Sequence, residues 1–241
     1  MGTSNQQSAR SSGDKEKAEF PFINNFQVSA KQFTYLNHLQ KEAFALYSSI
    51  PFPNSAAGEW QKVKWQDFCP TDYTTLSTNL ATSEPSAEFP QILSQNMIFI
   101  QKEFLKDEFQ NFYPLYSEKG FIVGSTLDTE SKFPEKVIHK IGTIIQPSHD
   151  KFSAFSFAFS NDPTVFYLEE NTHLSKPVFY QEIINGNKVA APSLMLIYLS
   201  RNSSVTVIRQ QKSIDQQNIF SSVILEIFLE EGARLDLIDL E

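Results

Sequence analysis

Thr164-Val-Phe-Tyr-Leu-Glu169 opens the stretch of sequence that decides the fold, and Arg234-Leu-Asp-Leu-Ile-Asp-Leu240 closes it. Four more strand-like runs lie between these two, and short turn signals such as Asn185-Gly186-Asn187 and Glu231-Gly232 separate them. No helical periodicity interrupts the series. Short strands with regular short connections are typical of a β-solenoid, a barrel or a sandwich. The six runs are 164–169, 177–184, 193–199, 204–209, 223–230 and 234–240.

Alternation within these runs indicates which face of each strand is buried. Residues 204–207 and 234–240 alternate apolar and polar side chains, as a strand with one buried face does. A solenoid stacks such strands so that each rung covers the previous one. No strict repeat period is visible in the sequence, so spacing alone does not separate a solenoid from a sandwich or a barrel.

Two helices are predicted upstream of the strands. Ser29 and Gln32 form a capping box ahead of an apolar stripe, and Pro51 ends the helix. A second, compact helix follows Asp150, whose side chain is a good N-cap. The apolar stripe of the first helix is Phe33, Leu36, Leu39, Ala43, Leu46 and Tyr47, and the face of the second is Phe152, Phe155 and Phe159.

The remaining upstream segments carry weaker signals. Residues 71–88 are rich in Thr and Ser without periodicity and are predicted to be a loop. Residues 96–104 predict a strand with a polar turn at Gln101-Lys102, and residues 120–125 predict a second short strand. Residues 136–145 are compatible with a short helix or a strand.

These observations divide the chain into three parts. Residues 1–25 are polar and predict a disordered tail, because they contain too few apolar side chains to offset the entropy of ordering. Residues 26–160 form an N-terminal α/β region. Residues 161–241 form the β-rich part. The predicted fold class is α+β, mainly β.

Composition excludes several classes of function. The chain has 20 Lys and Arg against 28 Asp and Glu, a net charge of −8, which argues against nucleic-acid binding. No apolar window is long enough for a transmembrane helix, and the N-terminus lacks the apolar segment of a secretory signal. The lone Cys69 excludes an intramolecular disulfide and a cysteine cluster for metal. We therefore expect a cytoplasmic protein that binds no membrane.

No motif of a known active site is present. The glycine-rich phosphate loop, the dinucleotide fingerprint and the nucleophile elbow of hydrolases are all missing. The acidic pairs Glu169-Glu170 and Glu230-Glu231 are interpreted as solvated turns, because neighbours on a strand face opposite sides. Cys69 and Trp60 are interpreted as structural. The four histidines, His38, His139, His149 and His173, do not have zinc-ligand spacing.

Several blocks resemble one family. Asp150-Lys-Phe-Ser-Ala-Phe-Ser-Phe-Ala-Phe-Ser160, residues 164–177 and the runs 193–210 and 223–236 are similar, in this order, to the SufB/SufD family of iron–sulfur cluster assembly scaffolds. Upstream, Gly58-Glu-Trp60 and residues 96–104 resemble the SufD branch. The resemblance spans roughly 29–241. Gln101-Lys102 departs from the family's Asn-Gly turn.

The resemblance implies a fold, a function and partners. It implies the first rungs of a right-handed β-helix over 161–241, continuing in the family beyond Glu241, with a β-sandwich as the alternative. It implies a non-catalytic subunit that associates with SufB-like and SufC-like proteins, or with a second copy of itself. No catalytic, cofactor-binding or metal residue is expected, and an iron–sulfur cluster would be present only transiently in the assembled complex. The alternative function is that of a carbohydrate-active or other β-helix protein unrelated to iron–sulfur assembly.

Overall fold

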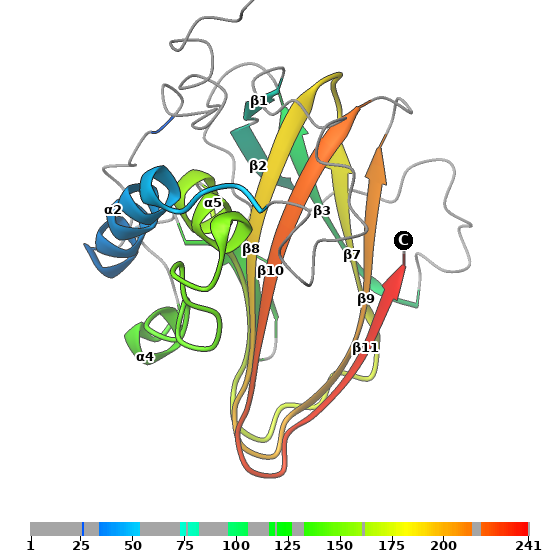
Figure 1. Cartoon of the computed structure of the whole chain (residues 1–241). Coiled ribbons are helices and arrows are strands. Elements are labelled where there is room, and N and C mark those ends of the chain that lie inside the picture. Colours follow the sequence, from blue (N-terminus) through cyan, green and yellow to red (C-terminus); the bar gives the residue numbers. More distant parts are fainter. Residues whose placement is uncertain are drawn as a thin grey trace, which may run out of the picture.

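The chain folds into two β-sheets and a layer of helices, as seen in the computed structural model (Figure 1). The structure describes residues 26, 34–53, 73–75, 77–81, 96–105, 116–118, 120–126, 133–160, 162–213 and 218–240. In chain order the elements are α2 (Thr34–Ser49), β1 (Thr74–Thr75), β2 (Ser77–Ala81), β3 (Ile98–Leu105), β4 (Tyr116–Glu118), β5 (Phe121–Ser125), α4 (Glu135–Ile138), α5 (Lys151–Phe159), β6 (Thr164–Leu168), β7 (Val178–Ile184), β8 (Val189–Leu199), β9 (Ser204–Ser213), β10 (Ile219–Leu229) and β11 (Arg234–Leu240).

From β6 onward the chain visits the two sheets alternately. Strands β6, β8 and β10 pair in parallel in one sheet, and β7, β9 and β11 pair in parallel in the other. Thr164 lies beside Met195, which in turn lies beside Leu225. One coil of the chain therefore takes about 30 residues, a length that suits a stacked repeat. Figure 1 shows these strands running side by side down the molecule and turning together at one end.

The turn from the first sheet to the second has the same backbone conformation in every coil. Asn171, Asn202 and Gly232 occupy equivalent places and all have a positive φ, of 59°, 53° and 73°. The amide of Asn171 donates to the carbonyl of Arg201, and that of Asn202 donates to the carbonyl of Glu231, both at 3.0 Å. Residues that tolerate the left-handed conformation therefore define the corner of the coil.

Two hydrophobic clusters lie on either side of the first sheet. One fills the space between the two sheets, and the other joins the outer face of the first sheet to the helices. The inter-sheet cluster includes Ile100, Phe121, Phe166, Tyr180, Met195, Ile197 and Val207. The helix-covered cluster includes Leu36, Tyr47, Val137, Phe155, Phe159, Val165 and Leu196.

The two predicted helices are confirmed within the described residues. The first, α2, buries Leu36, Leu39, Ala43 and Tyr47. Helix α5 begins after Asp150, whose carboxylate accepts a hydrogen bond from the amide of Ser153 at 2.6 Å, as an N-cap does. The two helices pack on each other through aromatic rings. The rings of Tyr47 and Phe159 meet edge to face, with 5.3 Å between their centroids. The predicted capping box at Ser29 and Gln32 lies outside the described residues.

The mainly β, mixed α and β class is confirmed, and the six downstream strands are found where the runs predicted them. The turn at Gln101-Lys102 was wrong: both residues lie inside the continuous strand β3, because Lys102 is buried and hydrogen-bonded. The loop at 71–88 was wrong in part, because β1 and β2 lie within it. Strand β2 pairs antiparallel with β3, so backbone pairing compensates for its lack of apolar alternation. The ambiguous 136–145 segment contributes to the short helix α4.

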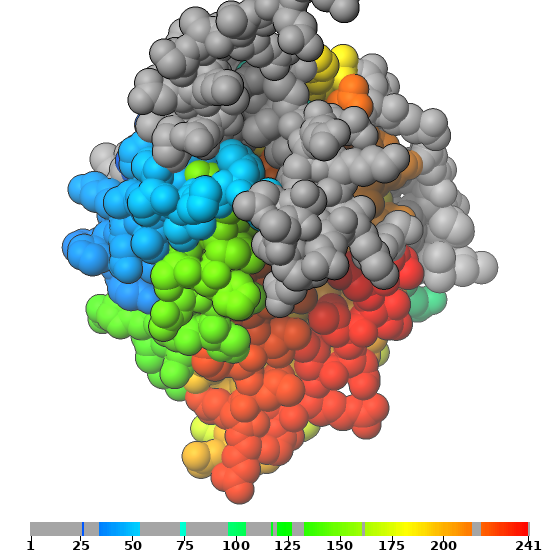
Figure 2. Space-filling view, viewed as in Figure 1, coloured from blue at the N-terminus to red at the C-terminus, as the bar shows by residue number. Residues whose placement is uncertain are grey.

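Strands β10 and β11 are the last two strands of the described residues. Within the described part of the chain, β10 pairs only with β8, and β11 pairs only with β9. The large exposed apolar side chains here are Leu229, Ile238 and Leu240, with 49%, 47% and 40% of their surface accessible. Figure 2 shows this last coil, in red, as the lower front of the molecule.

A candidate functional site between the two sheets

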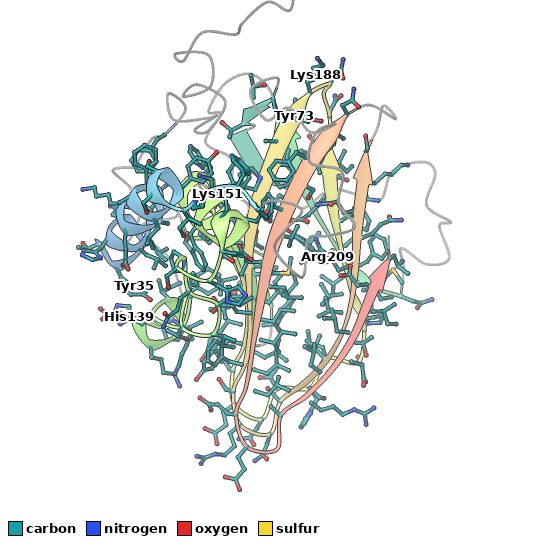
Figure 3. All side chains as sticks on the ribbon, viewed as in Figure 1. Tyr35, Tyr73, His139, Lys151, Lys188 and Arg209 are labelled. Atoms are coloured by element: carbon teal, nitrogen blue, oxygen red, sulfur yellow. The ribbon has the colours of Figure 1, made fainter. Side chains whose placement is uncertain are left out.

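Four charged side chains of the second sheet, which also includes β3 paired in parallel with β7, point into the space between the sheets. Lys102 lies two residues after Ile100 on β3, and Arg209 lies two residues after Val207 on β9, so each shares the face of a core residue. In the strand register Lys102 is opposite Glu182, and Arg209 is opposite Asp239. The charge therefore alternates in sign from strand to strand across β3, β7, β9 and β11. Arg209 is labelled in Figure 3.

The carboxylate of Glu182 is the centre of this cluster. Its side chain is completely buried. One oxygen accepts hydrogen bonds from the hydroxyls of Ser193 at 2.7 Å and Tyr180 at 3.3 Å. The other accepts from the guanidinium of Arg209 at 2.9 Å and the amide of Gln211 at 3.3 Å. A buried carboxylate with four donors is compensated for the loss of water.

Lys102 lies at the fully buried end of the cluster. Its ammonium donates to the backbone carbonyl of Asp162 at 2.9 Å and to the hydroxyl of Thr164 at 3.1 Å. Burial lowers the pKa of Lys102, and the negative charges of Asp162 and Glu182 oppose that shift. The carboxylate of Asp162 also accepts a hydrogen bond from Ser125. Lys102 thus joins β3 to the start of β6 on the opposite sheet.

Arg209 lies at the other end of the cluster, beside the partly exposed Asp239. Its guanidinium donates through Nη1 to both carboxylate oxygens of Asp239 and through Nη2 to Glu182. Burial alone would lower the pKa of Arg209, but the charges and hydrogen bonds of Glu182 and Asp239 outweigh it and raise that pKa. Burial, together with the charge of Glu182, raises the pKa of Tyr180 well above its usual range. The Arg209 guanidinium and the Tyr180 phenol therefore keep their protons at neutral pH.

A second buried carboxylate holds the loop between α4 and α5. Glu226 of β10 is 2% exposed and accepts hydrogen bonds from the backbone amides of Gly142 at 2.6 Å, Ile144 at 2.8 Å and Ile145 at 3.1 Å. Tyr35 of α2 donates to the carbonyl of Ile141 in the same loop at 2.7 Å. Three backbone amides of one loop thus converge on one carboxylate and form an anion-binding nest, which is filled here by the protein's own side chain.

Glu230, at the corner of the last coil, is more than a solvated turn residue. Its carboxylate accepts a hydrogen bond from the hydroxyl of Tyr198, another from the amide of Arg201 at 3.0 Å, and forms an ion pair with Lys136 at 3.3 Å. The first of these contacts is the largest cause of the lowered pKa of Glu230. The interpretation as a solvated turn was therefore wrong for Glu230, whereas Glu169, Glu170 and Glu231 are exposed.

The other residues singled out in the sequence are not brought together. His38, His139, His149 and His173 are exposed, and His173 contacts Ser204 at 2.9 Å. Among the described residues, no group of three His, Cys, Asp or Glu side chains could hold a metal ion. Trp60 and Cys69 lie outside those residues.

Sequence reasoning missed the inter-sheet cluster. The available signal was the position of Lys102, Glu182 and Arg209 at inward places of otherwise apolar strands, since a charge in such a register needs a buried partner. Which charges pair depends on the strand register, and the sequence alone does not specify that register.

These features define a class of protein: a mixed α and β, mainly β molecule whose chain alternates between two sheets tied together by buried charges. A family model described as SufBD protein N-terminal region matches residues 23–179, more than half of the chain. The chain belongs to the SufB/SufD family, which acts in iron–sulfur cluster assembly. The match ends within β7, whereas the coil continues to β11.

No curated protein matches the chain. Within the part of the chain that the structure describes, no helix is long and apolar enough to cross a membrane.

Proposed function

We propose that this protein is a SufD-like scaffold subunit that acts in iron–sulfur cluster assembly by protein–protein association. The family match over residues 23–179 is the observation that carries the proposal. The charged groups between the sheets support a structural role, because Lys102, Glu182 and Arg209 all engage other protein groups. In this proposal the protein is cytoplasmic and is not an enzyme. It holds an iron–sulfur cluster only transiently, within the assembled complex.

We also propose that the strands from β6 to β11 form the first rungs of a right-handed β-helix. Alternate strands pair in parallel at an offset of about 30 residues, as the rungs of a β-helix would. We take the coil to be right-handed, in keeping with the usual handedness of parallel crossover connections. A β-sandwich would share the two facing sheets, but sandwiches are typically built from antiparallel strands.

The proposed partners are SufB-like and SufC-like subunits, or a second copy of the chain. Exposed apolar side chains support association: Leu229 at the end of β10, and Ile238 and Leu240 on β11. Apolar side chains gathered on a surface favour contact with another protein.

Co-purification tests the proposal directly. The full chain, expressed together with SufB-like and SufC-like subunits, is expected to elute with them as one complex. The double variant Ile238→Lys and Leu240→Lys, which places charge on the exposed face of β11, is expected to weaken both this complex and any homodimer. A folded chain that binds neither subunit would contradict the proposed function.

A further inference from the structure

The connection between β7 and β8 contains an asparagine followed by glycine. The four connecting residues are Asn185-Gly186-Asn187-Lys188, and the side chain of Asn185 is exposed. Gly186 has a φ of +143°, and a Cβ placed on it would lie 2.7 Å from Cγ1 of Val189. The backbone conformation and the close approach of Val189 therefore both favour glycine directly after Asn185.

This pair of residues has a characteristic reactivity. The backbone nitrogen of the residue after an asparagine can attack the side-chain amide carbon, and a following glycine offers no side chain to hinder that attack. No side-chain hydrogen bond holds Asn185 within the residues described, so its amide group is free to rotate toward the nitrogen of Gly186.

We propose that Asn185 is a site of spontaneous modification, at which the chain converts asparagine to a mixture of aspartate and isoaspartate. The nitrogen of Gly186 loses its proton and bonds to Cγ of Asn185, the bond from Cγ to Nδ2 breaks, and the side-chain nitrogen takes up the proton and leaves as ammonia. Water then opens the resulting succinimide ring at either carbonyl. The reaction uses only water, and no atom is oxidised or reduced.

Two other exposed asparagines provide a contrast within the same fold. Asn171 and Asn202 are followed by Thr172 and Ser203, whose amides already donate to the carbonyls of Glu169 and Ser200, both at 3.3 Å. The side chain of Asn202 also donates to that of Asn171 at 3.5 Å. The attacking nitrogen is therefore engaged at both corners, and each asparagine is followed by a residue that has a side chain.

The modification would alter the connection between β7 and β8 next to a small hydrophobic cluster. Isoaspartate adds a methylene group to the backbone, and the connection joins Ile184 to Val189, which pack in one small cluster with Phe104, Ala191 and Ile219. It also adds a negative charge next to Gly186. We therefore expect the modified molecules to have a lower thermal midpoint than the unmodified ones.

Peptide mapping of the aged, full-length protein tests this proposal. After prolonged incubation at physiological temperature and mildly alkaline pH, mass spectrometry that separates aspartate from isoaspartate should find both at Asn185, while Asn171 and Asn202 stay intact. The variant Asn185→Gln, at an exposed position, should lose the acidic charge variant that accumulates in the parent chain.

Three outcomes would overturn the proposal. One is an intact Asn185 in the aged protein while a free peptide spanning residues 183–190 reacts, which would show that the fold protects the site. The second is modification of Asn171 or Asn202 at the same rate as Asn185. The third is an acidic charge variant that persists in Asn185→Gln.

Discussion

Arg209 of β9 binds the carboxylate of Asp239 on β11 with two hydrogen bonds, at 3.0 and 2.9 Å, and donates a third to Glu182 on β7 at 2.9 Å. A single guanidinium thus spans three successive strands of one sheet. The planar fork of arginine suits this role, since it can meet two carboxylates at once. Arg209 therefore ties the last coil to the two strands that precede it in the sheet.

Removing this guanidinium should destabilise the protein strongly. The variant Arg209→Ala leaves Glu182 buried without its cationic partner, and breaking a buried ion pair from one side typically costs about 3–5 kcal/mol. The free energy of unfolding, measured by chemical denaturation, is expected to fall by about that amount.

Arg234→Ala is the matched control for Arg209→Ala. Arg234 also pairs with an aspartate on β11, Asp236, at 3.1 Å, but both side chains are more than half exposed. Its removal should change the free energy of unfolding by less than about 1 kcal/mol. Equal losses in the two arginine variants would show that burial of the Arg209 pair has no energetic weight.

The nest around Glu226 makes a local prediction. Glu226→Ala removes the acceptor of three backbone amides and should lower the free energy of unfolding by about 1.5–3 kcal/mol. Amide hydrogen exchange should speed up at Gly142, Ile144 and Ile145, while the amides of β8 keep their protection. The exposed Glu231→Ala serves as the control, and unchanged exchange at these three amides would argue against the nest.

The sequence was informative where a local pattern determines structure. The apolar spacing of α2 and the cap at Asp150 depend only on neighbouring residues, so both helices could be predicted. The strand runs were equally local. The repeat was hidden because its corners use Asn171, Asn202 and Gly232, which share a backbone conformation rather than a residue type.

The buried charges could not be assigned in the same way. Gln101 and Lys102 are adjacent polar residues that interrupt an apolar run, and such a pattern predicts a turn. The strand continues because Lys102 reaches Asp162 and Thr164, sixty or more residues away in sequence. Only the three-dimensional register brings such partners together. A charge at an inward position of a strand indicates that a buried partner is needed, but it does not indicate which residue that partner is.

The corner at Gly232 leads to a prediction about backbone strain. An alanine there would adopt a left-handed conformation, which costs about 1–2 kcal/mol, and its Cβ would clash with Oδ1 of Asn202. Gly232→Ala should therefore lower the thermal midpoint. In the background of Asn202→Gly, which removes the contacting side chain, Gly232→Ala should lower the midpoint by a smaller amount. An equal loss in both backgrounds would show that only the backbone conformation matters.

Glu230 makes stability depend on pH in the acid range. Its pKa in the folded protein lies below the ordinary value of 4.5, chiefly because Tyr198 donates a hydrogen bond to the carboxylate. A carboxyl group with a lowered pKa adds stability above its unfolded pKa, and this contribution disappears as the pH falls through the folded pKa. The parent chain should thus be more stable than Glu230→Gln at neutral pH, and the two should converge as the pH falls below 4.5.

Denaturation curves recorded at several pH values measure this convergence. The expected difference is small, since the carboxylate is partly exposed and surface ion pairs contribute little. Glu231→Gln, at the neighbouring exposed position, should follow the parent chain at every pH. Tyr198→Phe removes the main donor, so in that background Glu230→Gln should change the free energy of unfolding by a smaller amount. A difference that stays constant between neutral and acid pH would mean that Glu230 does not titrate differently in the folded and unfolded chains.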